Sequence, residues 1–116
     1  MPFINRTVDN ILKGKISITQ LKHGFRYGFD AVFLAAFVNS FLLQYKIKDV
    51  LVADVGSGVG TISLIIAYKN KKIKLTSIEN NNQYLELAEE NIINNNFQKQ
   101  INLLNCDVFN LSLIHI

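Results

Sequence analysis

The sequence of 116 residues has little of what marks secreted, membrane-spanning or metal-binding proteins. It contains one cysteine, Cys106, which cannot form an internal disulfide and therefore fits a reducing cytosol. The longest apolar run, residues 31–38, is far shorter than the roughly 20 residues of a membrane-spanning helix. No basic segment followed by an apolar stretch opens the chain, and no Cys/His spacing indicates a metal site. We therefore expect a cytoplasmic protein with no membrane partner and no bound metal.

Composition and charge indicate one globular domain with an uneven surface charge. Apolar residues make up 49% of the chain and charged residues 18%, which excludes intrinsic disorder. Residues 1–48 carry seven Lys and Arg against two acids, a net charge of +5, whereas residues 49–116 carry five Lys against seven acids, a net charge of −2. A basic first segment could bind a polyanion such as RNA, and it could equally be an ordinary solvated surface.

The first part of the chain is predicted to be a β-rich lead-in, residues 1–29, followed by a helix over residues 30–44. Gly14, Gly24 and Gly28 separate short extended pieces in residues 15–29. Asp30 is a candidate N-cap for a helix that runs from residue 31 to about residue 43. Because the first two turns are almost wholly apolar, we expect this helix to be buried on most sides.

Residues 49–109 form an alternating pattern of strands and helices. Apolar or β-branched segments at 49–55, 73–79 and 100–109 predict strands, and helical spacing of apolar residues predicts helices at 58–70 and 82–96. A β-α-β-α-β order implies a parallel sheet with right-handed crossovers. The predicted fold class is therefore α/β with a Rossmann-like sheet.

An acidic residue stands at the carboxyl end of each predicted strand. These residues are Asp54, Glu79 and Asp107. Ligands of open parallel sheets bind beyond the carboxyl ends of the strands. The three acids therefore mark a candidate ligand site, together with the glycine-rich turn "GSGVG" at residues 56–60 that follows the first strand.

Three kinds of ligand compete for the glycine-rich turn. A phosphate-binding P-loop requires a lysine in the turn, and no lysine lies between Lys48 and Lys69. A dinucleotide site fits Gly56 and Gly58, but position 61 is threonine and the third glycine comes one residue early, at Gly60. A half of an NAD-dependent oxidoreductase is therefore the weakest alternative.

Asp54 favours the third ligand, S-adenosylmethionine (AdoMet). A carboxylate two residues before the turn repels a pyrophosphate, whereas AdoMet carries an ammonium and a sulfonium and no phosphate. Gly56 and Gly58 allow its close approach, because they have no Cβ atom. The polar residues at the other strand ends suit the rest of the molecule: Glu79 for the ribose hydroxyls, Asp107 for the adenine amino group, Val108 for the ring edge through its backbone, and Asn80 as a further contact.

Two sets of residues resemble known families. The pattern of residues 54–60 with Glu79 and Asp107 resembles the first cofactor motifs of class I AdoMet-dependent methyltransferases. The upstream segment "RTVDNILKGKISITQLKHGFRYGFDAVFLAAFV" resembles the lead-in of the bacterial tRNA(Val) adenine-N6 methyltransferase family. The matching positions are Gln20, Gly24, Phe25, Arg26, Asp30, Ala31, Val32, Leu34, Ala35 and Ala36, with Phe25 in place of the usual tyrosine.

The resemblance implies a function and a set of contacts. The segment from Arg26 to Asp30 would lie over the methionine end of AdoMet. The whole parent enzyme would methylate N6 of the adenine just 3′ of the anticodon, with tRNA as its partner.

One motif of the family is missing, and three expectations follow. The family's catalytic Asn-Pro-Pro-Tyr/Phe motif is absent, since the only proline is Pro2. We therefore assign no catalytic residue, and expect an incomplete fold that is inactive alone. Without the strand that carries this motif, residues 50–54 would form an apolar edge that invites self-association. A non-catalytic fragment that binds AdoMet or pairs with another subunit is the alternative.

Overall fold

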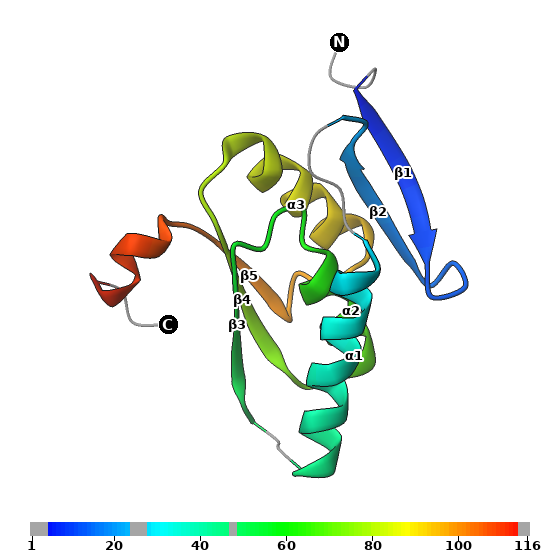
Figure 1. Cartoon of the computed structure of the whole chain (residues 1–116), viewed down its shortest axis with the longest axis vertical. Helices are drawn as coiled ribbons and strands as arrows, with labels where there is room; N and C mark the ends of the chain where they lie inside the picture. The colour runs from blue at the N-terminus through cyan, green and yellow to red at the C-terminus, as the bar shows by residue number, and fades with distance from the viewer. Residues whose placement is uncertain (1–4, 24–27, 47–48, 114–116) are drawn as a thin grey trace.

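The computed structural model describes residues 5–23, 28–46 and 49–113, with side chains described as far as residue 110. The described chain forms an N-terminal hairpin, a parallel sheet of three strands, and helices that lie between them (Figure 1). None of the helices in this part of the chain is long and apolar enough to cross a membrane.

The N-terminal hairpin consists of β1 (Arg6–Ile11) and β2 (Ile16–Leu21). The strands pair in antiparallel register, with Arg6 opposite Leu21 and Ile11 opposite Ile16. Ile16 and Ile18 of β2 are completely buried and join the main core. The β-rich lead-in is thus a hairpin that the rest of the fold covers on its β2 side. The predicted extended residues 24–27 lie outside the described residues.

Helix α1 (Phe29–Gln44) differs from its predicted form in two respects. Its N-cap is Gly28, and the Asp30 side chain lies in the first helical turn without forming a cap hydrogen bond, so the prediction of an Asp30 cap was wrong. An acid in the first turn still complements the helix dipole. Burial on most sides was also wrong: α1 packs against one helix through Ala35 and Leu42, while most of its circumference is exposed.

The second half forms the predicted β-α-β-α-β unit. The elements are β3 (Leu51–Val55), α2 (Thr61–Lys69), β4 (Lys74–Glu79), α3 (Asn82–Asn94) and β5 (Ile101–Asn105), followed by the 3₁₀ helix η1 (Val108–Leu113). The strands run parallel in the order β3-β4-β5. The predicted strands and helices are confirmed, except that α2 starts three residues later than expected and the last strand ends at Asn105 rather than residue 109.

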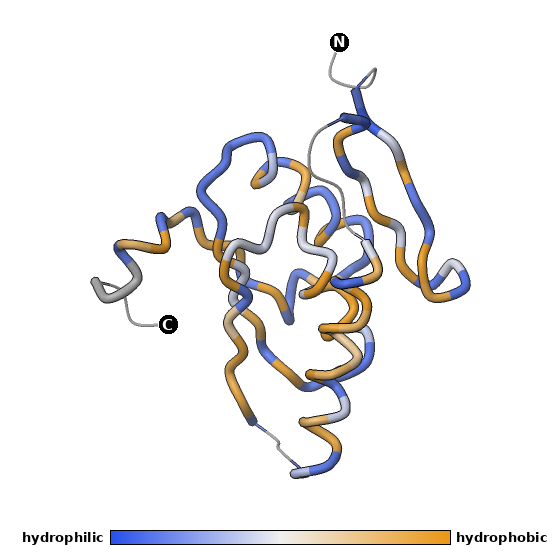
Figure 2. Tube along the Cα trace, in the orientation of Figure 1, coloured by the Kyte–Doolittle hydropathy of each residue, from blue (hydrophilic) through white to orange (hydrophobic). Residues whose placement is uncertain are grey.

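Helices cover one face of the sheet, and the other face is exposed along β3. Val52, Leu75 and Ile101 lie side by side in the register and point into the core with α2 and α3. On the other face Leu51 and Val55 are about half exposed. β3 pairs only with β4 in the described sheet, so it is an edge strand, as expected for residues 50–54. In Figure 2 most of α1 and β3 is orange, the colour of hydrophobic residues.

Candidate functional site

The glycine-rich turn leaves β3 and reaches α2 through three left-handed glycines. The φ angles are +68° at Gly56, +58° at Gly58 and +95° at Gly60, a region that side chains with a Cβ disfavour. The N–H groups of Gly56 and Ser57 both donate to the carbonyl of Ile78, at 2.8 and 3.0 Å. A Cβ built at any of the three glycines would meet no atom within 4 Å, so the space beside the turn is open.

Glu79, at the end of β4, faces this turn. Its Oε1 accepts from Gly58 N at 2.8 Å, and its Oε2 accepts from Asn80 N and Asn81 N at 3.1 and 3.0 Å. The carboxylate is therefore fixed by three backbone donors. Each carboxylate oxygen has several acceptor sites, so Oε1 can still accept from a ligand hydroxyl.

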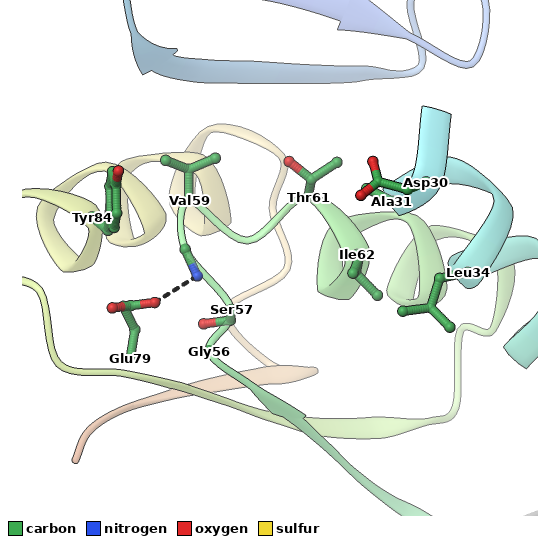
Figure 3. A pocket seen from close by; sticks show the side chains of 11 residues that line it. Asp30, Ala31, Leu34, Gly56, Ser57, Val59, Thr61, Ile62, Glu79 and Tyr84 are labelled. Carbon is green, nitrogen blue, oxygen red and sulfur yellow. Dashed lines mark hydrogen bonds between the residues drawn. The ribbon is translucent and has the colours of Figure 1, made fainter. Parts of the chain in front are cut away.

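A hollow of about 290 Å³ lies above the turn. Figure 3 shows Glu79 and Tyr84 on one side of the turn, and Asp30, Ile62 and Leu34 on the other. The hollow is close to the lower limit of pockets that hold small molecules, about 300 Å³. Its lining consists of Asp30, Ala31, Leu34, Gly56, Ser57, Gly58, Val59, Thr61, Ile62, Glu79 and Tyr84.

Thr61 offers the clearest sign of a ligand in this hollow. The residue is 4% exposed, and its Oγ1 is buried without a hydrogen-bond partner among the described residues. Leaving a buried hydroxyl unpaired costs about 1–3 kcal/mol. Thr61 is also the first residue of α2, whose N-terminal N–H groups favour an anionic group. The hydroxyl and the helix end together suit an acceptor such as a carboxylate.

A second, smaller hollow of about 180 Å³ adjoins the first, because Gly56 and Glu79 line both. It is lined by Val55, Gly56, Ile78, Glu79, Asn80, Cys106, Asp107 and Val108. The ends of β3, β4 and β5 meet here, as the parallel order requires. The Asp107 carboxylate already accepts from Phe109 N at 3.0 Å, which anchors the start of η1.

Asp54 lines neither hollow. Its Oδ2 accepts from the Ser63 hydroxyl of α2 at 2.7 Å, and the Ser63 hydroxyl also contacts the Ser77 hydroxyl of β4 at 2.6 Å. Burial raises the pKa of Asp54 above its ordinary value and the negative charge of Glu79 raises it further, while hydrogen bonds from Ser63 lower it. Asp54 therefore joins β3 to α2 beneath the turn, and its direct contact with a ligand stays a prediction.

The structure brings most of the predicted site residues together. Around the two hollows lie Asp30, Gly56, Gly58, Glu79, Asn80, Asp107 and Val108. Gly60 shapes the turn without lining either hollow, and Arg26 lies outside the described residues.

Sequence reasoning missed Thr61 and Tyr84. Thr61 was noted only as a departure from the dinucleotide pattern. A hydroxyl directly after the last glycine, at the start of a helix, was the signal that could have singled it out.

The match to known proteins agrees with this arrangement. Residues 34–112 match the family described as the methyltransferase small domain, and the chain belongs to that family. Among curated proteins it is similar to the tRNA1(Val) (adenine(37)-N6)-methyltransferase of Flavobacteriaceae bacterium strain 3519-10, with 31% identity over 93 residues. That alignment covers 80% of this chain but 38% of the relative.

Solved structures share the fold at low sequence identity. A SAM-dependent methyltransferase from Agrobacterium tumefaciens superimposes with a TM-score of 0.71 at 13% identity, over 89% of this chain and 33% of its own. TYW2 of M. jannaschii in complex with AdoMet gives 0.70 at 15%, over 89% and 44%. The complex of aTrm5 with tRNALeu gives 0.72 at 18%, over 92% and 29%. These likenesses confirm the Rossmann-like α/β methyltransferase fold.

Proposed function

We propose that this chain forms the AdoMet-binding part of an RNA methyltransferase. The observation that carries the proposal is the hollow above the glycine turn, which has the Glu79 carboxylate at one end and the unpartnered Thr61 hydroxyl with Asp30 at the other. These ends differ in chemistry, as do the two ends of AdoMet. A ligand with ribose hydroxyls at one end and an amino-acid group at the other satisfies both.

The donor and acceptor set fits AdoMet group by group. Glu79 would accept from the ribose hydroxyls, and the open space beside Gly56 and Gly58 would admit the sugar and the sulfonium. Thr61 and the start of α2 would hold the carboxylate, while Asp30 would neutralise the ammonium. The second hollow, with Asn80, Asp107 and Val108, would take the adenine. When bound, the cofactor supplies an activated methyl group.

We propose adenine N6 in tRNA as the methyl acceptor of the whole protein. Support comes from the curated relative, whose name states this reaction, and from the basic residues 1–48. The Asn-Pro-Pro-Tyr/Phe motif that holds the target amine in the resembled family is absent from these 116 residues. We propose accordingly that they bind the cofactor and that methyl transfer needs further residues.

Calorimetry with AdoMet tests the cofactor proposal, and Thr61 gives it a specific signature. The change Thr61→Val removes an unpaired buried hydroxyl, so the folded chain should be equally stable or more stable in urea. AdoMet affinity should fall about 5-fold, the equivalent of one hydrogen bond of about 1 kcal/mol. Thr61→Ser keeps the hydroxyl and serves as the matched control. Undiminished affinity in Thr61→Val would remove Thr61 from the site, and tighter binding of NAD than of AdoMet would overturn the cofactor proposal.

Methyl transfer from radiolabelled AdoMet to unmodified valine tRNA tests the acceptor proposal. We expect no incorporation by the 116 residues alone. Incorporation at adenine N6 would support the tRNA assignment and contradict the need for further residues. Labelling of a base atom other than adenine N6 would contradict the proposed acceptor.

A second candidate function rests on the open edge of the sheet. The exposed apolar residues of β3 and α1 favour pairing of residues 50–54 with another chain, including a second copy. Sedimentation equilibrium over a range of concentrations tests this proposal. A monomer at all concentrations would contradict self-association.

A further inference from the structure

Two asparagines, Asn91 on α3 and Asn95 at its C-cap, hold the edge of β2 that faces away from β1. Asn91 Oδ1 accepts from Thr19 N at 2.7 Å and its Nδ2 donates to Thr19 O at 2.9 Å. One helical turn later, Asn95 Oδ1 accepts from Ser17 N at 2.9 Å and its Nδ2 donates to Ser17 O at 2.7 Å. Each amide group thus pairs with one β2 residue as a neighbouring strand would.

The spacing of the two elements explains this pairing. Four residues of an α-helix rise about 6 Å, and two residues of a strand rise about 6.6–6.8 Å, so the side chains at positions 91 and 95 match every second residue of β2. Arg6 of β1 adds a contact in which its Nη1 donates to both carboxylate oxygens of Glu90, at 2.8 Å each. The hairpin is therefore attached to α3 by directional polar contacts as well as by buried isoleucines.

Only Asn91 of this pair reaches the glycine turn. Its Nδ2 also donates to Val59 O at 3.0 Å, whereas the second acceptor of Asn95 Nδ2 is Asn91 O on its own helix. Val59 stands between Gly58 and Gly60 and lines the first hollow. Asn91 is 1% exposed, so water cannot take over its bonds without rearrangement of the core.

Side chains hold the turn at two peptide groups, one on each side of the Gly58–Val59 peptide. Glu79 accepts from the N–H of Gly58, and Asn91 donates to the C=O of Val59. Left-handed glycines give the turn little conformational preference of its own. Backbone bonds to Ile78 O and Ser57 O hold its start and its end, and these two side-chain contacts hold the part between them. One of them is in the proposed ligand site, and the other leads to the hairpin.

We propose that Asn91 is a positioning residue that couples the N-terminal hairpin to the cofactor turn. Through one amide group it fixes both the edge of β2 and the carbonyl of Val59, so displacement of either one disturbs the other. The affinity readout rests on the proposed function, since it requires that the hollow bind AdoMet. The coupling itself is a property of the folded chain and is measurable without a ligand.

The isosteric variants Asn91→Asp and Asn95→Asp form a matched pair. Each retains the oxygen that accepts from β2, and each replaces an amide that donates to two carbonyls by a carboxylate oxygen. We expect Asn91→Asp to shift the backbone amide resonances of Gly58 and Gly60 as well as those of β2. Asn95→Asp should shift those of β2 and leave the turn in place. AdoMet affinity should fall about 10-fold or more in Asn91→Asp and less than 2-fold in Asn95→Asp.

Amide hydrogen exchange of the unaltered chain provides a readout that does not require a variant to fold. Because coupling between two sites is reciprocal, saturating AdoMet should slow exchange at Thr19, which Asn91 holds, more than at Ser17, which Asn95 holds. Equal protection of both amides, or equal disturbance of the turn by the two variants, would reduce Asn91 to a structural contact and overturn the proposal. If the unaltered chain binds no AdoMet, the proposed function fails, and the resonances of Gly58 and Gly60 still decide the coupling.

Discussion

The two sides of this molecule differ in how far their side chains find partners within the chain. On the closed side, which consists of β2, α3 and the glycine turn, the buried Asn91 and the half-buried Asn95 find partners within the chain. On the open side, which consists of the outer face of α1 and β3, large apolar side chains face solvent. Phe29, Phe33 and Phe37 are 81%, 70% and 69% exposed, and they recur every fourth residue.

The contrast teaches where this fold can accept a neighbour. The closed side uses the amide groups of Asn91 and Asn95 within the chain, so these groups offer a second chain little. The open side combines an apolar helix face, whose only charged residue is Asp30, with a strand edge that has free backbone groups. Such a surface gains from being covered, by apolar side chains and by another strand.

The largest effect is expected in the core of the closed side. Ile18→Ala removes a completely buried side chain and should lower the free energy of unfolding by about 2–5 kcal/mol. Urea denaturation followed by circular dichroism measures this change. Val8→Ala on the exposed side of the same hairpin is the control and should cost less than about 0.5 kcal/mol. A small loss in Ile18→Ala would mean that the hairpin is not part of the core.

The next effect concerns the cofactor turn. Glu79→Gln removes the charge that accepts from the turn, and from the ribose in the proposed complex. AdoMet affinity should fall about 10- to 100-fold, as expected for a charged hydrogen bond of about 1.5–3 kcal/mol. Calorimetry gives the affinity, and the exposed Glu89→Gln supplies the same change of charge on α3 as a control. Similar affinities for the two variants would remove Glu79 from the site.

A smaller effect arises from Asp54. Because burial raises its pKa in the folded chain, the folded state retains the proton to higher pH than the unfolded state does. The contribution of Asp54 to stability is therefore greatest below its pKa in the unfolded chain. It is lost as pH rises through its pKa in the folded chain, and the free energy of unfolding then falls by at most about 1.4 kcal/mol per pH unit. Asp54→Asn should reduce this fall of the free energy of unfolding with pH, which urea titrations between pH 4 and pH 7 measure. An unchanged slope would assign the decline to other groups.

The smallest effect on stability is expected on the open side. Phe33→Ser and Phe37→Ser should each change the free energy of unfolding by less than about 0.5 kcal/mol, because both side chains are mostly exposed. The double variant should nevertheless lower the average mass in sedimentation experiments, if the open side mediates association. A loss of stability comparable to that of Ile18→Ala would mean that these phenylalanines are packed in the folded chain, as the closed side is.

The order of strands and helices could be predicted, because the spacing of apolar residues along the chain determines it. Alternation of strand-like and helix-like segments placed the elements of residues 49–109 within a few residues, and two of the three acids at strand ends, Glu79 and Asp107, line the hollows. The burial of α1 was mispredicted because an apolar helix reveals its composition and not its neighbours. The N-cap of α1 was also mispredicted, since Gly28 and Asp30 are both acceptable caps and the backbone selected the glycine.

Polar contacts between residues far apart in the chain could not be predicted from the sequence. Asn91 is one polar position within a helical segment, and its partners Thr19 and Val59 are 72 and 32 residues away. No periodicity connects such positions. Thr61 was overlooked for a similar reason, because its lack of a partner is visible only once the core around it is built.

The contacts of Asn91 and Asn95 with β2 also bear on the order in which parts of the chain fold. A hairpin of two strands is marginal by itself in water, and this one completes its second edge with side chains from residues 91 and 95. A chain made from its N-terminus must therefore lengthen by some seventy residues after Thr19 before β2 meets Asn91. The hairpin is thus synthesised before the residues that secure it, and assembly of the cofactor turn and locking of the hairpin would occur as one late step.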